Sequence, residues 1–122
     1  MKSSLPTDSE LNILKVLWEK GPSRVRDVHQ ELGKVGYTTV LKLLQIMHNK
    51  GIVERERAGS GHIYSPAVSR EVTEQRLVAR LVDEVFDGST HRLIMSALGP
   101  EAVSRAGLKK IRKQIKKEEA AR

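Results

Sequence analysis

The chain has 122 residues, enough for one ordinary domain or two small modules. It carries 22 Lys and Arg against 15 Asp and Glu, and the net charge of +7 favours an acidic partner such as a nucleic acid or an anionic membrane. The absence of cysteine excludes disulfides, thiolate metal sites and cysteine nucleophiles. No apolar run approaches the ~18 residues of a membrane span. The start, MKSSLPTDSE, lacks the apolar segment of a signal peptide, so we expect a cytoplasmic protein.

Two short amphipathic helices are predicted first. The first begins at a capping box, in which the Thr7 hydroxyl accepts from the amide of Glu10 and the Glu10 side chain accepts from the amide of Thr7. Gly21-Pro22 ends this helix, and we expect Ser23 to cap the second. Residues 33–36 then form a turn. The apolar residues at helical spacing are Leu11, Leu14, Leu17, Trp18, Val25, Val28 and Leu32.

A third helix with two contrasting faces follows, within GYTTVLKLLQIMHNKGIV at residues 36–53. At about 100° per residue, its apolar residues fall within one sector and its polar residues within the opposite one. Lys50-Gly51 closes the helix, with a cation in its last turn and a glycine just past it. The apolar sector holds Val40, Leu43, Leu44 and Met47, and the polar sector holds Thr38, Lys42, Gln45 and Asn49.

From Ile52 the period changes to that of strands. IVERERAGSGHIYSP predicts a hairpin of the longer-loop kind, joined by residues 58–61 and ended by Pro66. Three short helices followed by a basic-tipped hairpin are the order of a winged helix-turn-helix. The predicted fold class is therefore mainly α, with a winged-helix domain over residues 1–68.

Residues 69–122 predict three more helices and a dimerisation domain. We expect Ser69 to cap the fourth helix, Asp87-Gly88 to end it, Ser89 or Thr90 to open the fifth, and Pro100 to start the sixth. So few residues bury little surface alone, so we expect a twofold homodimer that shares its core. The expected shared core is Leu77, Leu81, Val85, Leu93, Leu98, Leu108, Ile111 and Ile115.

The polar face of the third helix carries chemistry that suits the major groove of DNA. Glutamine can bond adenine, a threonine methyl can pack on thymine, and lysine can reach guanine or a phosphate. The alternative is a solvated helix face, but the preceding helix, the turn and the hairpin favour DNA. The contacts predicted from this helix are Tyr37, Thr38, Thr39, Lys42, Gln45 and Asn49.

The hairpin and the second helix supply further candidate contacts. An arginine-bearing wing can follow the DNA backbone or enter a minor groove, although charged hairpin edges also prevent aggregation. Free amides and cations at the start of the second helix can hold a phosphate. The candidates are Ser23, Arg24 and Arg26 in that helix, and Arg55, Arg57, Ser60 and His62 in the wing.

A denser basic run lies near the C-terminus. It suggests either a second DNA contact or the solvated face of a dimerisation helix, and the solvated face is the favoured interpretation. Its members are Lys109, Lys110, Arg112, Lys113, Lys116 and Lys117.

Catalytic and metal-binding patterns are not apparent. The sequence has no glycine-rich phosphate loop, nucleophile elbow or HExxH pair. Its histidines, at positions 29, 48, 62 and 91, stand apart and lack the short spacings of metal ligands. We therefore predict a protein that is not an enzyme and needs no metal or cofactor.

The motifs LPTDSELNILKVLWEKGPSRVRDVHQEL and GYTTVLKLLQIMHNKGIVERERAGSGHIYSP strongly resemble the penicillinase and methicillin-resistance repressors, the BlaI/MecI/CopY family. The resemblance implies a dimeric repressor with an N-terminal winged helix and a C-terminal three-helix dimerisation region. It also implies binding to inverted-repeat operators with TACA/TGTA-type elements. Tyr37, Thr38 and Thr39 match the family's Tyr-Thr-Thr at the start of the reading helix, whereas Ile46 stands where other members have arginine.

Two departures bear on how the repressor is released. Members controlled by a sensor protease are cut between Asn and Phe, and Ser96-Ala97 stands at the matching place here, so a regulatory protease partner is unsupported. Copper-responsive members carry paired cysteines, which this chain lacks.

The sequence therefore predicts a homodimeric repressor of transcription that binds palindromic double-stranded DNA. Two alternatives stay open at this point. One is a winged-helix module for protein interaction without an operator of its own, and the other is a ligand- or metal-responsive DNA-binding sensor.

Overall fold

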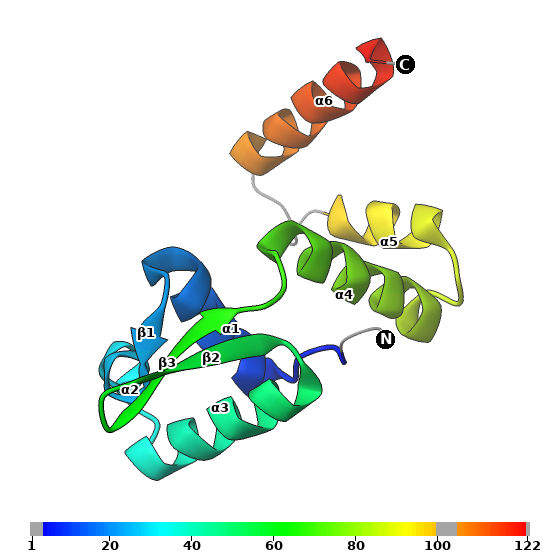
Figure 1. The fold of residues 1–122 in the computed structure, drawn as a ribbon. Helices are drawn as coiled ribbons and strands as arrows, with labels where there is room; N and C mark the ends of the chain where they lie inside the picture. The colour runs from blue at the N-terminus through cyan, green and yellow to red at the C-terminus, as the bar shows by residue number, and fades with distance from the viewer. Residues whose placement is uncertain (1–3, 100–104, 122) are drawn as a thin grey trace. The chain divides into compact units, whose positions relative to one another are not determined.

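The computed structural model describes residues 4–99 and 105–121. Six helices and three strands are present in these ranges (Figure 1). No helix within them is both long enough and apolar enough to cross a membrane. The elements in chain order are α1 (Asp8–Lys20), β1 (Ser23–Arg24), α2 (Val25–Leu32), α3 (Tyr37–Lys50), β2 (Val53–Ala58), β3 (Gly61–Pro66), α4 (Arg70–Val85), α5 (Thr90–Ala97) and α6 (Arg105–Ala120).

The chain divides into two compact units, Met1–Leu77 and Val78–Arg122. The first, called the winged unit below, holds α1 to β3 and the first half of α4. The predicted division into domains 1–68 and 69–122 stays a prediction, because α4 continues through the boundary between the compact units.

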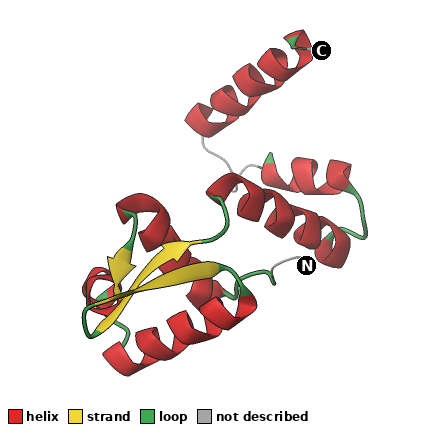
Figure 2. Cartoon of the chain, viewed as in Figure 1, coloured by secondary structure: helices red, strands yellow, loops and turns green. Residues whose placement is uncertain are grey.

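The winged unit is built on a small antiparallel sheet with the strand order β1-β3-β2 (Figure 2). Apolar residues of the three helices and of β2 and β3 pack into one core, which confirms the predicted winged-helix fold class. The fully buried side chains of this core are Ile13, Leu14, Leu17, Val28, Val40, Leu44, Met47, Ile52, Val53 and Tyr64.

Local signals that the sequence predicted set the ends of α1 and α3. The Thr7 hydroxyl accepts from the amide of Glu10 at 3.2 Å, and Glu10 Oε1 accepts from the amide of Thr7 at 2.9 Å. Helix α3 ends at Gly51, whose φ of 80° lies in the left-handed region that favours glycine. Both helices therefore begin and end as predicted.

Two predictions around the sheet are wrong. Ser23 does not cap α2, because Ser23 and Arg24 form β1 and pair with Tyr64 and Ile63 of β3. The cap residue of α2 is Arg24, whose amide donates to Asp27 Oδ2 at 3.0 Å. The hairpin loop is also shorter than predicted, because Ala58 pairs directly with Gly61. Only Gly59 and Ser60 remain in the turn, and the φ of Gly59 is +66°, as a tight two-residue turn requires.

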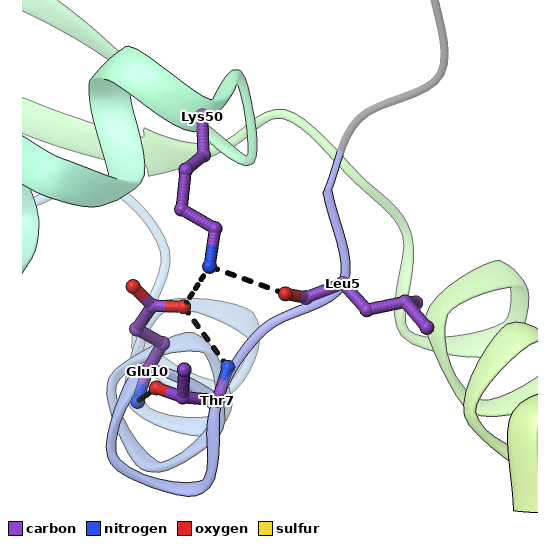
Figure 3. A network of polar contacts seen from close by, with 4 residues as sticks. All are labelled: Leu5, Thr7, Glu10 and Lys50. Atoms are coloured by element: carbon purple, nitrogen blue, oxygen red, sulfur yellow. Dashed lines mark hydrogen bonds and ion pairs between the residues drawn. The ribbon is translucent and has the colours of Figure 1, made fainter.

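A buried ion pair joins the start of α1 to the end of α3 (Figure 3). Lys50 Nζ lies 2.6 Å from Glu10 Oε1 and also donates to the backbone carbonyl of Leu5 at 3.2 Å. Glu10 is only 2% exposed. The same Glu10 oxygen also accepts from the amide of Thr7, so the cap of α1 and the last turn of α3 share one carboxylate.

Trp18 fastens the segment after the wing to α1. Its indole Nε1 donates to the carbonyl of Val68 at 2.9 Å. The guanidinium of Arg70 lies over the Trp18 ring, 5.2 Å from the ring centroid, in a cation–π arrangement. The start of α4 is thereby held within the winged unit.

Two serines begin helices beyond the wing. Ser69 caps α4 and Ser89 caps α5, as predicted. The predicted start of the sixth helix at Pro100 lies outside the described residues.

The second unit leaves its apolar side chains largely uncovered. From Val78 onward, Val82 is the one buried side chain in the described part of the chain.

Replacing Lys50 with Met should lower the free energy of unfolding by about 3–5 kcal/mol, because the Glu10 carboxylate would stay buried without its partner. Urea unfolding followed by circular dichroism measures the change. Lys20→Met is the matched control, since it breaks a Lys–Glu pair of 3.0 Å whose two side chains are both about half exposed. We expect the control to leave the unfolding midpoint nearly unchanged. Equal shifts in the two variants would contradict the importance of burial.

Candidate nucleic-acid interface

The exposed face of α3 carries most of the predicted reading residues. Thr38, Thr39, Lys42, Gln45 and Asn49 are exposed, while the apolar side of the same helix is buried in the core. At about 100° per residue, Thr39 lies at the edge of this face and the other four share its centre. The four central residues are called the reading face below. It combines hydroxyl, ammonium and amide groups on one helix.

At that edge, Thr39 also faces a pocket between α3 and α1. It lines a small pocket of about 260 Å³ with Ser9 and Asn12 of α1 and with Leu43 of α3. Thr39 is therefore set toward α1, whereas the reading face points into solvent.

A groove lies beside the start of α3, where three elements of the winged unit come together. Its volume is about 810 Å³, and its walls come from the start of α2, the start of α3 and the tip of the wing. Five predicted contact residues line it: Arg24, Arg26, Tyr37, Ser60 and His62. The fold therefore brings together residues that are up to 38 positions apart in the sequence.

Side chains position the two ends of this groove. The Tyr37 ring meets the His29 ring edge to face, with centroids 5.7 Å apart, so α2 holds Tyr37 in place. Arg24 extends toward the wing. Its Nη1 lies 3.5 Å from the position that a Cβ would occupy at Gly61. Two arginines, a phenol and a hydroxyl around an open groove can bind a phosphate by charge and by hydrogen bonds.

The wing separates its charges onto two faces. The alternating sequence VERERA places Arg55 and Arg57 on one side of β2 and Glu54 and Glu56 on the other. In the hairpin register Arg57 lies opposite His62, so one face of the wing is cationic. A simple solubilising edge would not require this separation.

His62 lies within this cationic face, and its pKa is lowered from the ordinary value. Desolvation is the main cause, followed by the charges of Arg55 and Arg57 of β2 and by His48 of α3. Arg55 and Arg57 are permanent cations. An anion bound to the wing would therefore relieve a repulsion that disfavours protonation of His62.

Ser23, which was also predicted as a contact, does not line the groove. Ser23 is 6% exposed, and its hydroxyl donates to the carbonyl of Gly21 at 2.9 Å. Because β1 pairs with β3, this side chain turns inward and does not present its hydroxyl to a phosphate. Arg24 and Arg26, which follow it, remain on the groove.

Sequence reasoning missed the residues that hold the interface in place. Glu10 and Lys50 orient α1 and α3, and His29 supports Tyr37. The capping box marked Glu10 as structural, but no local pattern indicates a partner 40 positions away. Within the described residues, no group of three His, Cys, Asp or Glu side chains is arranged to hold a metal.

The predicted dimerisation residues lie in the second half of the chain and are poorly covered. Leu81 is 41% exposed and Val85 is 59% exposed, and Ile111 and Ile115 are also exposed. The remaining four, Leu77, Leu93, Leu98 and Leu108, are half-buried.

A sequence model described as penicillinase repressor matches residues 6–117. The chain belongs to the penicillinase repressor family. The family is one of DNA-binding transcriptional regulators, and both the membership and the winged-helix fold support a DNA-binding repressor. In this family member, Ser96-Ala97 lies in α5 with both residues exposed.

Several solved structures are similar to this family member. One is the monomeric form of Bacillus licheniformis BlaI in complex with the blaP half-operator, at 25% identity over 57% of this chain and 89% of that chain, with a TM-score of 0.49. Another is a homodimeric winged helix-turn-helix DNA-binding domain from Mycobacterium bovis, at 28% identity over 70% and 77% of the two chains, with a TM-score of 0.48. A transcriptional regulator from Thermotoga maritima shares the fold, at 21% identity over 94% and 74%, with a TM-score of 0.50. No curated protein sequence matches the chain.

The lowered pKa of His62 predicts that DNA binding depends on pH. His62 is neutral at pH 7 in the free protein, because its pKa lies below the ordinary value of 6.5. A phosphate bound at the wing would raise this pKa, so binding would take up a proton and affinity should rise as the pH falls from about 8 to about 6. Fluorescence anisotropy with a labelled duplex at constant ionic strength measures this.

His62→Gln should flatten the dependence, and His91→Gln in α5 serves as the control that should retain it. An unchanged pH profile in the His62→Gln protein would contradict a phosphate contact at the wing.

Proposed function

We propose that this protein is a homodimeric transcriptional repressor that binds an inverted-repeat operator in double-stranded DNA. The observation that carries the proposal is the exposed reading face of α3 beside the cationic groove. One surface thus offers groups that distinguish bases and groups that bind phosphates. Occupation of such an operator would block transcription from the overlapping promoter.

The reading face supplies the discrimination in this mechanism. An α-helix fits the major groove, and each good base contact is worth about 1–3 kcal/mol of discrimination. Gln45 is suited to adenine, Thr38 to a thymine methyl, and Lys42 to guanine or a phosphate. The first turn of α3 lies next to the groove, which would place phosphates at Tyr37, Arg24 and Arg26.

The wing supplies a sequence-independent contact. Arg55, Arg57 and His62 share one face, and Ser60 lies in the tip. Phosphate contacts of this kind release counterions, so they make affinity fall as salt rises. The acidic face of the wing, with Glu54 and Glu56, would be directed away from the DNA.

The dimer rests on the exposed apolar side chains of α4 to α6. Leu81, Val85 and Ile115 keep between 41% and 59% of their surface exposed, which is unusual for large aliphatic residues unless a partner covers them. A second copy would bury them and carry a second reading helix. Two such helices would lie roughly 34 Å, or a multiple of it, apart along one side of the duplex.

Dimerisation would also provide the means of release. A subunit bound to a single half-site lacks the second contact, which removes most of the gain from linking two sites. Any event that opens the apolar contact between subunits would therefore free the operator. The inducing signal would act on α4 to α6 and leave the reading face intact.

A gel shift with DNA from upstream of the protein's own gene tests the proposed function directly. We expect a retarded complex that survives excess scrambled competitor. If no complex forms, and α3 instead captures a protein partner, the winged helix serves protein interaction; Ile46, 38% exposed beside the reading face, would be its apolar anchor.

The two kinds of DNA contact should respond differently to mutation. Gln45→Ala should weaken binding to preferred sites by about 1–3 kcal/mol and spare scrambled duplexes, because it removes a base contact. Arg57→Ala should weaken all duplexes to a similar degree, because it removes a phosphate contact. Anisotropy titrations on cognate and scrambled duplexes measure both. Equal losses on both duplexes for both variants would refute the assigned roles.

Leu81→Asp should convert the dimer to a monomer, because it puts a charge into the apolar contact between subunits. Sedimentation at low micromolar concentration measures the oligomeric state. Ala79→Asp is the matched control, since Ala79 is exposed on the opposite side of α4 and its replacement should leave the dimer intact. A Leu81→Asp protein that is still dimeric would show that the subunits meet elsewhere.

A further inference from the structure

The positive charge of the chain is concentrated in α6. Its 16 residues, RAGLKKIRKQIKKEEA, hold seven Lys and Arg against two Glu, a net charge of +5 out of the +7 of the whole protein. Six of the seven form what is called the cationic face below. These are Lys109, Lys110, Arg112, Lys113, Lys116 and Lys117.

The cationic face and the apolar residues of α6 lie on different sides of the helix. At about 100° per residue, the six cations cover a sector of about 160°, while Leu108, Ile111 and Ile115 fall within about 60° on the roughly opposite side. Glu118 and Glu119 flank the apolar residues. A partner that covers the apolar side therefore leaves the cationic face open.

The cations of this face have no acidic partners in the described ranges. All six are exposed, and none takes part in a salt bridge within 4.0 Å among the residues that the structure describes. One side-chain hydrogen bond along α6 runs from Gln114 Nε2 to Glu118 Oε1 at 3.0 Å, away from the cations. Cationic groups without an acidic partner are thus presented along about two turns of helix.

Simple solvation explains this pattern poorly. Solubilising surfaces mix both signs of charge, as α4 does with its Arg80–Glu84 pair. On α6 the spacing repeats like charges four residues apart, at Lys109–Lys113 and Lys113–Lys117, and such pairs disfavour the helix. A polyanion bound along this face would remove that repulsion.

We propose that the cationic face of α6 is a second DNA contact, which binds the phosphate backbone of duplex DNA without reading its sequence. The face holds cations and alanine, with no amide or hydroxyl group to distinguish bases. Lysine binds phosphate as a point charge, which suits a contact that tolerates any sequence. The inference rests on the proposed function only in that duplex DNA is the ligand, because α6 lies outside the winged unit.

Duplex DNA fits the face better than a membrane does. A helix that lies in a lipid interface needs a broad apolar face with bulky anchors, and α6 offers three aliphatic residues and no aromatic one. Those three residues also belong to the larger set proposed for the dimer contact. The remaining surface is purely electrostatic and matches a regular array of phosphates.

The test measures how duplex affinity depends on salt. Full-length wild type and Lys109→Gln/Lys113→Gln are titrated on a long scrambled-sequence duplex over a range of salt concentrations. Each lost phosphate contact should make the slope of log affinity against log salt shallower by about 0.9, with affinity at moderate salt falling roughly threefold to tenfold. Glutamine keeps the helix propensity of lysine, and circular dichroism verifies that α6 stays folded.

The matched control is Lys15→Gln/Lys20→Gln, which removes two exposed lysines from α1 and should leave the slope nearly unchanged. Gln45→Ala should also keep the wild-type slope on scrambled DNA. Loss of base recognition by α3 can therefore be distinguished from loss of the phosphate contact of α6. Binding to vesicles of anionic lipid is measured in parallel for all the variants.

Three results would overturn the inference. If the α6 variant matches wild type on the duplex, the cationic face does not contact DNA, while the proposed function stands. A wild-type protein that binds no duplex defeats both. A variant that loses vesicle binding but keeps the wild-type duplex slope would assign the face to a membrane.

Discussion

The ion pair between Glu10 and Lys50 is the constraint on which the geometry of the interface depends. It joins the first turn of α1 to the last turn of α3 through a carboxylate that is almost wholly buried. Because removal of Lys50 would leave the buried Glu10 carboxylate without a partner, the pair favours one arrangement of the two helices. That arrangement buries Val40, Leu44 and Met47 and leaves the opposite side of α3 in solvent. The direction of the reading face thus follows from a contact at the far end of the helix.

The two halves of the chain differ in how complete they are. The winged unit closes its core with its own residues, down to the Trp18 hydrogen bond that secures the start of α4. Beyond Leu77 the described helices bury a single side chain, Val82. A unit that has so little core of its own would gain stability from a second copy. Such a dependence on a partner would make the affinity of the winged unit for DNA adjustable, because the number of reading helices would change with assembly.

Features set by interactions between residues close in the sequence could be predicted, whereas features set by contacts between distant residues could not. The capping box at Thr7, the apolar period of α3 and Gly51 are local signals, and the helices they mark begin and end where they indicate. The strand β1 is two residues long and exists only because β3 pairs with it, so Ser23 was mistaken for a cap. The Glu10–Lys50 pair was not predicted for the same reason, because it forms only in the tertiary fold. The groove could be predicted as a set of residues but not as a cavity.

The arrangement of charge connects these observations to selectivity. In the wing, strand alternation alone separates Arg55 and Arg57 from their glutamate neighbours, so a short sequence produces a cationic face by geometry. On α6 the same separation arises from helical period. In the proposed mechanism, the contacts that distinguish bases come from α3 and not from these two faces. Affinity and selectivity would thus reside on different elements, and a change of salt would alter affinity for all duplexes while the preference set by α3 persisted. Variation at Lys42 or Gln45 could then change the operator without loss of general DNA binding.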